Sequence, residues 1–212
     1  MNSISITVNG LSKEFNQCSV FTDISFSLSS PASLSITGKN GAGKSTLLKI
    51  LAGLLSSTQG SIVYSVNEKQ IGIEEFKQYI GFVSPYLNLY DEFTAFENLE
   101  FLSRIRAATR QNGERINEML ALVGLWNRGD DMVGTFSSGM KQRLKYAFAI
   151  LHNPTVLILD EPTTNLDAEG IEIVKQIILE QKKTNILIIA ANNKEETNWC
   201  AQQIKVGTMQ QY

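Results

Sequence analysis

The sequence predicts an α/β fold whose mostly parallel sheet follows an antiparallel β part and is interrupted by a block of helices. The stretches TVLILD (155–160) and NILIIAA (185–191) are apolar at nearly every position, as in parallel strands covered on both faces. Strand-like and helix-like stretches also alternate along the chain, which favours βαβ units. A mostly helical stretch from about 94 to 152 predicts a helical insertion in the α/β core.

The remaining elements follow from turn residues and apolar spacing. Short strands are expected within residues 3–37, at ISITV, ISFSL and SLSIT, and further strands at GSIVYS and YIGFVS. Helical spacing predicts helices over 45–55, 94–108, 114–125, 139–152 and 168–181. We expect one domain, residues 1–212, with a core of 1–85 and 153–212 and a helical subdomain of 86–152.

Composition narrows the class of protein. The 212 residues carry a net charge of −2, which gives no general attraction to nucleic acid, so no nucleic-acid partner is expected. The two cysteines, Cys18 and Cys200, lie far apart, as in proteins of a reducing cytosol. The first residues, MNSISITVNG, lack the basic start and apolar core of a signal peptide. The apolar runs are also too short to span a bilayer, so we expect a cytoplasmic protein.

A glycine-rich stretch, GKNGAGKST, lies between a predicted strand and a predicted helix. It fits the phosphate-binding pattern G-x-x-x-x-G-K-[ST], in the context that the pattern requires. Glycines let backbone N–H groups turn toward phosphate oxygens at a helix N-terminus. Lys44 is expected to reach the β- and γ-phosphates and Ser45 to bind Mg²⁺. The stretch therefore predicts a nucleoside triphosphate site formed by Gly38, Lys39, Asn40, Gly41, Ala42, Gly43, Lys44, Ser45 and Thr46.

An acidic pair ends the apolar strand VLILDEP. A strand that ends in an acid places its carboxylate at the carboxyl edge of the sheet, where α/β sheets bind ligands. Asp160 is expected to hold Mg²⁺, directly or through water, and Glu161 to act as the general base for an attacking water. The alternative is a strand capped by solvated acids, and the glycine loop weighs against it.

These motifs, with FSSGM (136–140) between them and TTNLD (163–167) after them, resemble the ABC-type ATPase family over nearly the whole chain. The resemblance implies a P-loop NTPase core and ATP hydrolysis by two domains paired head to tail, with a second copy or a homologous subunit. It also implies that Ser137, Ser138 and Gly139 contact the partner's ATP, and that Asp167 lies at the dimer interface. Taken alone, SSG at the start of a helix is better explained as a helix cap, and its position before VLILDEP reverses that judgement. For Asp167 a helix cap is the competing account.

An aromatic residue stands where the family stacks a ring on adenine. Phe15 offers such a ring face, and a place in the core is its alternative. The sequence also departs from the family pattern at three places. Ser84 and Pro85 occupy the position of a usual Gln, Asn192 that of a usual His, and Ser138 and Met140 replace commoner Gly and Gln in the signature. We expect Asn192 to hydrogen-bond the γ-phosphate with slower hydrolysis than in relatives with His.

Two functions of different class follow from the resemblance. The first is the ATPase subunit of a transporter, compact and exporter-like, peripheral on the cytoplasmic face of the cell membrane and docked on integral membrane subunits. The loop PYLNLYDEF supports it, because Tyr86, Leu87, Leu89 and Tyr90 suit an interface with a partner helix; packing of the helical insert against the core is the alternative. The second is a soluble ATP-dependent switch with weak turnover, which Pro85 and Asn192 favour.

Overall fold

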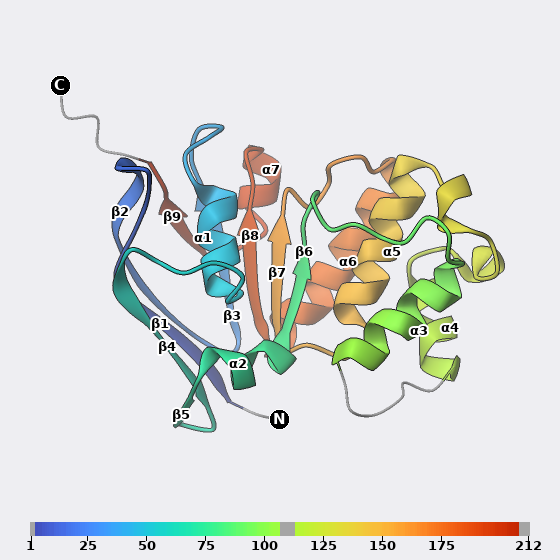
Figure 1. Cartoon of the computed structure of the whole chain (residues 1–212), viewed down its shortest axis with the longest axis horizontal. Coiled ribbons are helices and arrows are strands. Elements are labelled where there is room, and N and C mark those ends of the chain that lie inside the picture. The colour runs from blue at the N-terminus through green and yellow to red at the C-terminus, as the bar shows by residue number, and fades with distance from the viewer. Residues whose placement is uncertain (1–2, 107–112, 208–212) are drawn as a thin grey trace.

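The computed structural model describes residues 3–106 and 113–207 of the chain (Figure 1). Two sheets form its frame, a parallel sheet at the centre of the view and an antiparallel sheet at its left. Helices pack around the parallel sheet. Among the described residues, no helix combines the length and the apolar character needed to cross a membrane.

The parallel sheet has the strand order β6-β7-β8-β3-β9. Residues Ile36 of β3 and Asp160 of β7 both pair with Ala190 of β8, so the ends of β3 and β7 lie level at one edge of the sheet. The segments that follow these two strands therefore start side by side, with one strand between them. The strands are β3 (Ala32–Thr37), β6 (Ile80–Val83), β7 (Val156–Asp160), β8 (Ile186–Ala190) and β9 (Gln202–Lys205).

Alternate residues of β7 and β8 face two different cores, which explains why these strands are apolar throughout. Leu157 and Leu159 pack among the helices on one face of the sheet. Val156 and Ile158 pack on the other face, against α1 (Lys44–Leu51) and the antiparallel sheet. The alternation places Asp160, the next residue of the second set, on the face that carries α1.

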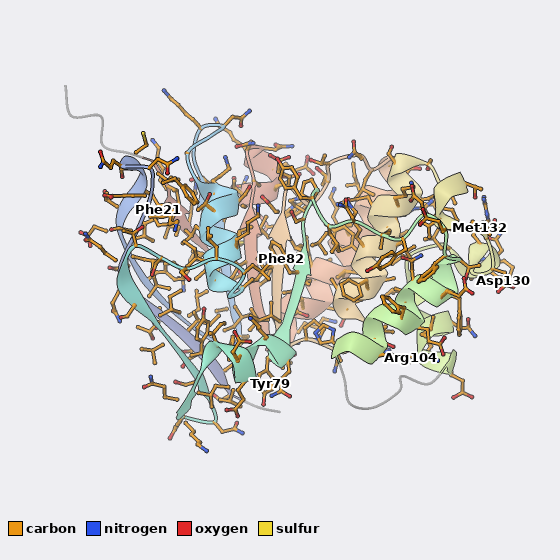
Figure 2. All side chains as sticks on the ribbon, in the orientation of Figure 1. Phe21, Tyr79, Phe82, Arg104, Asp130 and Met132 are labelled. Atoms are coloured by element: carbon orange, nitrogen blue, oxygen red, sulfur yellow. The ribbon has the colours of Figure 1, made fainter. Side chains whose placement is uncertain are left out.

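The antiparallel sheet has the order β2-β1-β4-β5 and belongs to the second core. Its strands are β1 (Ile4–Phe15), β2 (Cys18–Ser29), β4 (Gln59–Val66) and β5 (Lys69–Ile71). Phe21 of β2 is fully buried at its upper end, beside the start of α1 (Figure 2). The predicted α/β fold with an N-terminal antiparallel part is therefore confirmed.

The helical block follows β6. It consists of α3 (Ala95–Arg106), α4 (Gly113–Leu122) and α5 (Ser138–Ile150), and two 3₁₀ turns at Trp126–Arg128 and Val133–Thr135 connect α4 to α5. The long helix α6 (Ala168–Thr184) joins β7 to β8, and α5 and α6 share the first core with Leu157 and Leu159. Residues 107 and 108 of the predicted helix 94–108 lie outside the described residues.

The predicted helix 45–55 was too long. Helix α1 ends at Leu51 because Gly53 turns the chain with φ of +67°, and Leu54 is left exposed. Two short strands and two short α-helices were also missed: β5, β9, α2 (Ile73–Phe76) and α7 (Lys194–Thr197). Each has only three or four residues, too few for a periodic pattern to show.

Candidate active site

The glycine-rich loop runs from β3 directly into α1. Gly43 has φ of +94°, and a Cβ built on it would lie 2.5 Å from Cγ1 of Val20, so no other residue fits there. Gly41 also has a positive φ, +79°, but stands in open space. Both conformations turn the loop so that it enters α1 at Lys44, with the free N–H groups of the first helical turn at the loop.

The predicted lysine lies inside this loop. The side chain of Lys44 is buried, and its Nζ donates hydrogen bonds to the carbonyl oxygens of Gly38 at 3.0 Å and Lys39 at 3.1 Å. The ammonium group therefore spans the loop at the centre of its concave side. A buried cation that donates to neutral carbonyl oxygens keeps its charge and attracts an anion, which fits the predicted phosphate site.

Asp160 ends β7 beside this loop and is 1% exposed. Neither oxygen of its carboxylate has a hydrogen-bond partner within the described residues. Burial raises the pKa of Asp160, while the Ser45 hydroxyl and the Lys49 and Lys44 ammonium groups lower it. A buried carboxylate with free oxygens, beside a hydroxyl, is a donor set that suits Mg²⁺, so the residues present fit the predicted ion.

Glu161 follows in a left-handed conformation, with φ of +51°. Its N–H donates to the carbonyl of Ala190 at 2.9 Å, which ties the residue to the end of β8. Its two carboxylate oxygens accept hydrogen bonds from Thr164 Oγ1 at 3.3 Å and from Asn192 Nδ2 at 3.4 Å. The structure thus brings Asn192 to the predicted general base, whereas the single histidine, His152, lies with Nε2 3.1 Å from the carbonyl of Ile80.

Three further residues at this site were missed by sequence reasoning. They hold the segment that follows Glu161: Tyr146 Oη of α5 donates to the carbonyl of Pro162 at 2.7 Å, and Thr163 Oγ1 donates to Glu196 of α7. Glu196 is 5% exposed, and burial raises its pKa. No pattern in the sequence marks these residues, because each contact joins segments that are distant along the chain.

Removal of the Thr163 hydroxyl should destabilise the fold. In Thr163→Val the buried carboxylate of Glu196 loses this hydrogen bond, which we expect to lower the free energy of unfolding by about 1–3 kcal/mol. Urea unfolding measures the change. Thr163→Ser is the matched control, because it keeps the hydroxyl and should stay near the wild-type value. Equal stability of the valine and serine variants would contradict this role of the bond.

The predicted signature residues open α5. Ser137 is exposed, and its Oγ accepts a hydrogen bond from the N–H of Met140 at 3.2 Å. Ser138 is exposed as well, and Gly139 is partly exposed. In the view of Figure 1, strands β8, β7 and β6 stand between α1 and α5, so one chain does not bring these residues to its own glycine loop.

Asp167 and Phe15 also lie at the surface. The Asp167 side chain accepts from the N–H of Gly170 at 2.8 Å and caps α6, so the capping alternative is confirmed for Asp167 as it is for Ser137. An exposed cap remains open to a second contact. Phe15 is 46% exposed at the end of β1, and Lys13 Nζ lies 4.6 Å from its ring centre. The core alternative for Phe15 is therefore wrong.

The residues predicted for a partner interface lie in the loop after β6 and differ in exposure. Tyr86 is 73% exposed and Tyr90 44% exposed. Leu87 is half-buried, and half-buried Leu89 packs against the helical core. Ser84 is buried, and its Oγ accepts a hydrogen bond from the N–H of Tyr86 at 3.3 Å. The alternative, packing of the insert against the core, is therefore confirmed for Leu89. The side chains of Tyr86 and Tyr90 form an exposed aromatic surface.

Comparisons with known proteins identify the family of this chain. The family model described as "ABC transporter" matches residues 21–164. The chain is 35% identical over 191 residues to the uncharacterized ABC transporter ATP-binding protein YybJ of Bacillus subtilis (strain 168), with 90% of this chain and 86% of the relative covered. It is 33% identical over 205 residues to the linearmycin resistance ATP-binding protein LnrL of the same organism, with 95% and 65% covered.

A solved structure shows the same fold. The dimeric structure of a post-hydrolysis state of the ATP-binding cassette MJ0796, bound to ADP and Pi, superimposes with a TM-score of 0.84 at 20% identity, over 95% of this chain and 94% of that chain. The family model spans the glycine loop, the signature and the acidic pair. The chain therefore belongs to the ABC transporter family, as an ATP-binding ABC ATPase domain.

Proposed function

We propose that this chain is the ATP-hydrolysing subunit of a transporter. In this proposal two copies close head to tail on two Mg²⁺–ATP molecules and thereby move integral membrane subunits. The observation that carries the hydrolytic part is the pair at the end of β7. Asp160 presents a buried carboxylate beside Lys44 and Ser45, no described residue hydrogen-bonds its oxygens, and Glu161 follows it directly.

Each residue then has one task. Lys44 and the N–H groups of residues 38–46 bind the phosphates, and Ser45 and Asp160 hold Mg²⁺, which neutralises charge on the phosphate oxygens when it is bound. Glu161 takes a proton from the attacking water. Asn192, which contacts Glu161, donates a hydrogen bond to the γ-phosphate. Phe15 offers its exposed ring to adenine.

The second copy completes the site. Ser137, Ser138 and Gly139 contact the ATP bound by the partner, and Asp167 lies at the interface between the copies. The exposure of Ser137 and its place at the N-terminus of α5 support this assignment. The dimeric state of MJ0796, a protein of the same fold, also supports it.

Asn192 limits the rate in this proposal. An imidazolium at this position adds a charge-assisted hydrogen bond to the γ-phosphate, so Asn192→His should raise turnover by roughly fivefold, equivalent to about 1 kcal/mol. Steady-state phosphate release measures it, with Asn198→His as the control, because Asn198 is exposed and caps the opposite, C-terminal end of α7. Unchanged or lower turnover in Asn192→His would count against a role for Asn192 at the γ-phosphate.

A membrane partner is supported by the exposed aromatic residues Tyr86 and Tyr90 and by the relatives. One of these relatives is a linearmycin resistance ATP-binding protein, which favours an exporter-like role. The alternative function is a soluble ATP-dependent switch with weak turnover. Two residues favour it: Pro85 offers no polar side chain, and Asn192 cannot carry a charge.

Affinity purification in a mild detergent separates the two functions. The tagged protein is isolated from its native cells, and mass spectrometry identifies and quantifies what accompanies it. A membrane protein with several predicted spans in near-equal amount is the expected result, and it would show that the chain associates with the membrane. A soluble partner, or none, would contradict the transporter assignment and favour the switch.

A further inference from the structure

The loop of residues 84–92, called here the β6–α3 loop, begins at the catalytic edge of the sheet. Val83 of β6 pairs with Leu159 of β7 in parallel register, so the next residues along the two strands are Ser84 and Asp160. Ser84 is 2% exposed. A shift of the catalytic edge on nucleotide binding therefore reaches this loop through its buried first residue.

Helix α5 holds both ends of the loop with two lysines. Lys145 Nζ donates a hydrogen bond to the carbonyl oxygen of Pro85 at 3.0 Å. Lys141 Nζ pairs with Asp91 Oδ1 at 2.7 Å. The two lysines are four residues apart, on one face of the helix. Together with residues 87–92 they line a cavity of about 430 Å³.

The Lys145 hydrogen bond involves more desolvation of charge than the ion pair of Lys141 with Asp91. The exposed carboxylate of Asp91 remains solvated, whereas Lys145 is half-buried and lies beside a second positive charge. Burial lowers the pKa of Lys145, and Lys141 lowers it further. The acceptor is a backbone carbonyl, the only hydrogen-bonding group of Pro85, because proline has neither an N–H nor a polar side chain. The bond therefore fixes the backbone of the loop near its start.

Helix α5 links the Lys145 contact to the residues at the start of the helix. Lys145 lies two turns from Ser137, the exposed N-cap at the start of the helix. The helix is continuous over its 13 residues, from Ser138 to Ile150. Displacement of Pro85 by a nucleotide thus displaces Ser137, provided that the bond between Lys145 and Pro85 persists.

We propose that Lys145 is a positioning residue, which through the Pro85 carbonyl makes the start of α5 follow the nucleotide site of the same chain. This inference rests on the proposed function, because it takes ATP to be the ligand of the glycine loop. Lys141 holds the far end of the loop through an exposed ion pair and is not needed for this coupling. A substitution of Lys141 is therefore the control for the same substitution of Lys145.

Hydrogen exchange with and without a non-hydrolysable Mg²⁺–ATP analogue tests the coupling within one chain. The protein is kept at a concentration at which light scattering shows a monomer, so that contact with a partner's ATP does not itself slow exchange at the start of α5. In the wild type the analogue should slow exchange in residues 38–46, in the β6–α3 loop and in residues 138–145. Lys145→Met keeps the length of the side chain but removes the hydrogen-bond donor. In this variant the analogue should slow exchange in residues 38–46 and in the β6–α3 loop, but not in residues 138–145. Lys145→Arg, which keeps charge and donors, and the control Lys141→Met should behave as the wild type.

Turnover gives a second readout. Lys145→Met should lower kcat about tenfold with KM within twofold, and Lys145→Arg should restore kcat. Two results would overturn the inference. In one, the analogue slows exchange in residues 138–145 of Lys145→Met as much as in the wild type; in the other, it has no effect on these residues in the wild type. Absence of any response in residues 38–46 of the wild type would instead refute the proposed nucleotide site, and the inference with it.

Discussion

Replacement of Glu161 by glutamine is expected to lower ATP turnover by about 10²–10⁴-fold, the usual contribution of a general base. Glutamine has the same shape but takes no proton from water. Its side chain can keep the contacts to Thr164 and Asn192, so Mg²⁺–ATP affinity should stay within about threefold, or less than 1 kcal/mol. Phosphate release and titration with a fluorescent ATP analogue measure the two quantities.

The matched control for this variant is Glu172→Gln, an isosteric change on the exposed face of α6. It should leave both quantities unchanged. Turnover of Glu161→Gln within tenfold of the wild type would exclude Glu161 as the base. A parallel loss of affinity would instead show that the side chain binds ATP.

Replacement of Asp160 by asparagine should change activity and stability in opposite directions. The site loses its anionic ligand for Mg²⁺, so Mg²⁺-dependent turnover should fall at least 100-fold, or by about 3 kcal/mol. The apo protein should become more stable by roughly 1 kcal/mol, because the change removes a buried carboxylate whose oxygens have no hydrogen-bond partner within the described part of the chain. That corresponds to a rise in Tm of about 2–4 °C.

The raised pKa of Asp160 also determines how the stability of the apo protein changes with pH. Burial raises the pKa of Asp160 in the folded chain, so the folded state keeps its proton to higher pH than the unfolded state. Stability therefore falls as pH rises from the ordinary carboxyl pKa to the raised one, and the full cost is present above it. Calorimetry without nucleotide at neutral pH tests the prediction. A lower Tm for Asp160→Asn would show that the carboxylate stabilises the fold.

The sequence predicts those parts of the site that depend on local patterns. The predicted turn from β3 into α1 is confirmed, because the turn at Gly43 and the entry into α1 are determined by residues that are consecutive in the chain. Asp160 is found where it was predicted because an apolar strand covered on both faces, β7, ends at that residue. Its position on the face of α1 also follows from the alternation of strand side chains.

Contacts between distant segments could not be predicted in this way. Glu196 lies 33 residues from Thr163 along the chain, and Lys145 lies 60 residues from Pro85. No periodicity joins such pairs, and the acceptor at Pro85 is a carbonyl that any residue carries. Phe15 shows the same limit, since the pattern of β1 left both exposure and burial open.

The central claim is that a second copy of the chain completes the catalytic site. The molar mass of Glu161→Gln by light scattering, with saturating Mg²⁺–ATP, tests it most directly. The account predicts a shift from 23.5 kDa to twice that mass on addition of ATP, and no shift when Gly139→Arg is added to block the surface at the start of α5. A chain that binds ATP and stays at 23.5 kDa would contradict the claim.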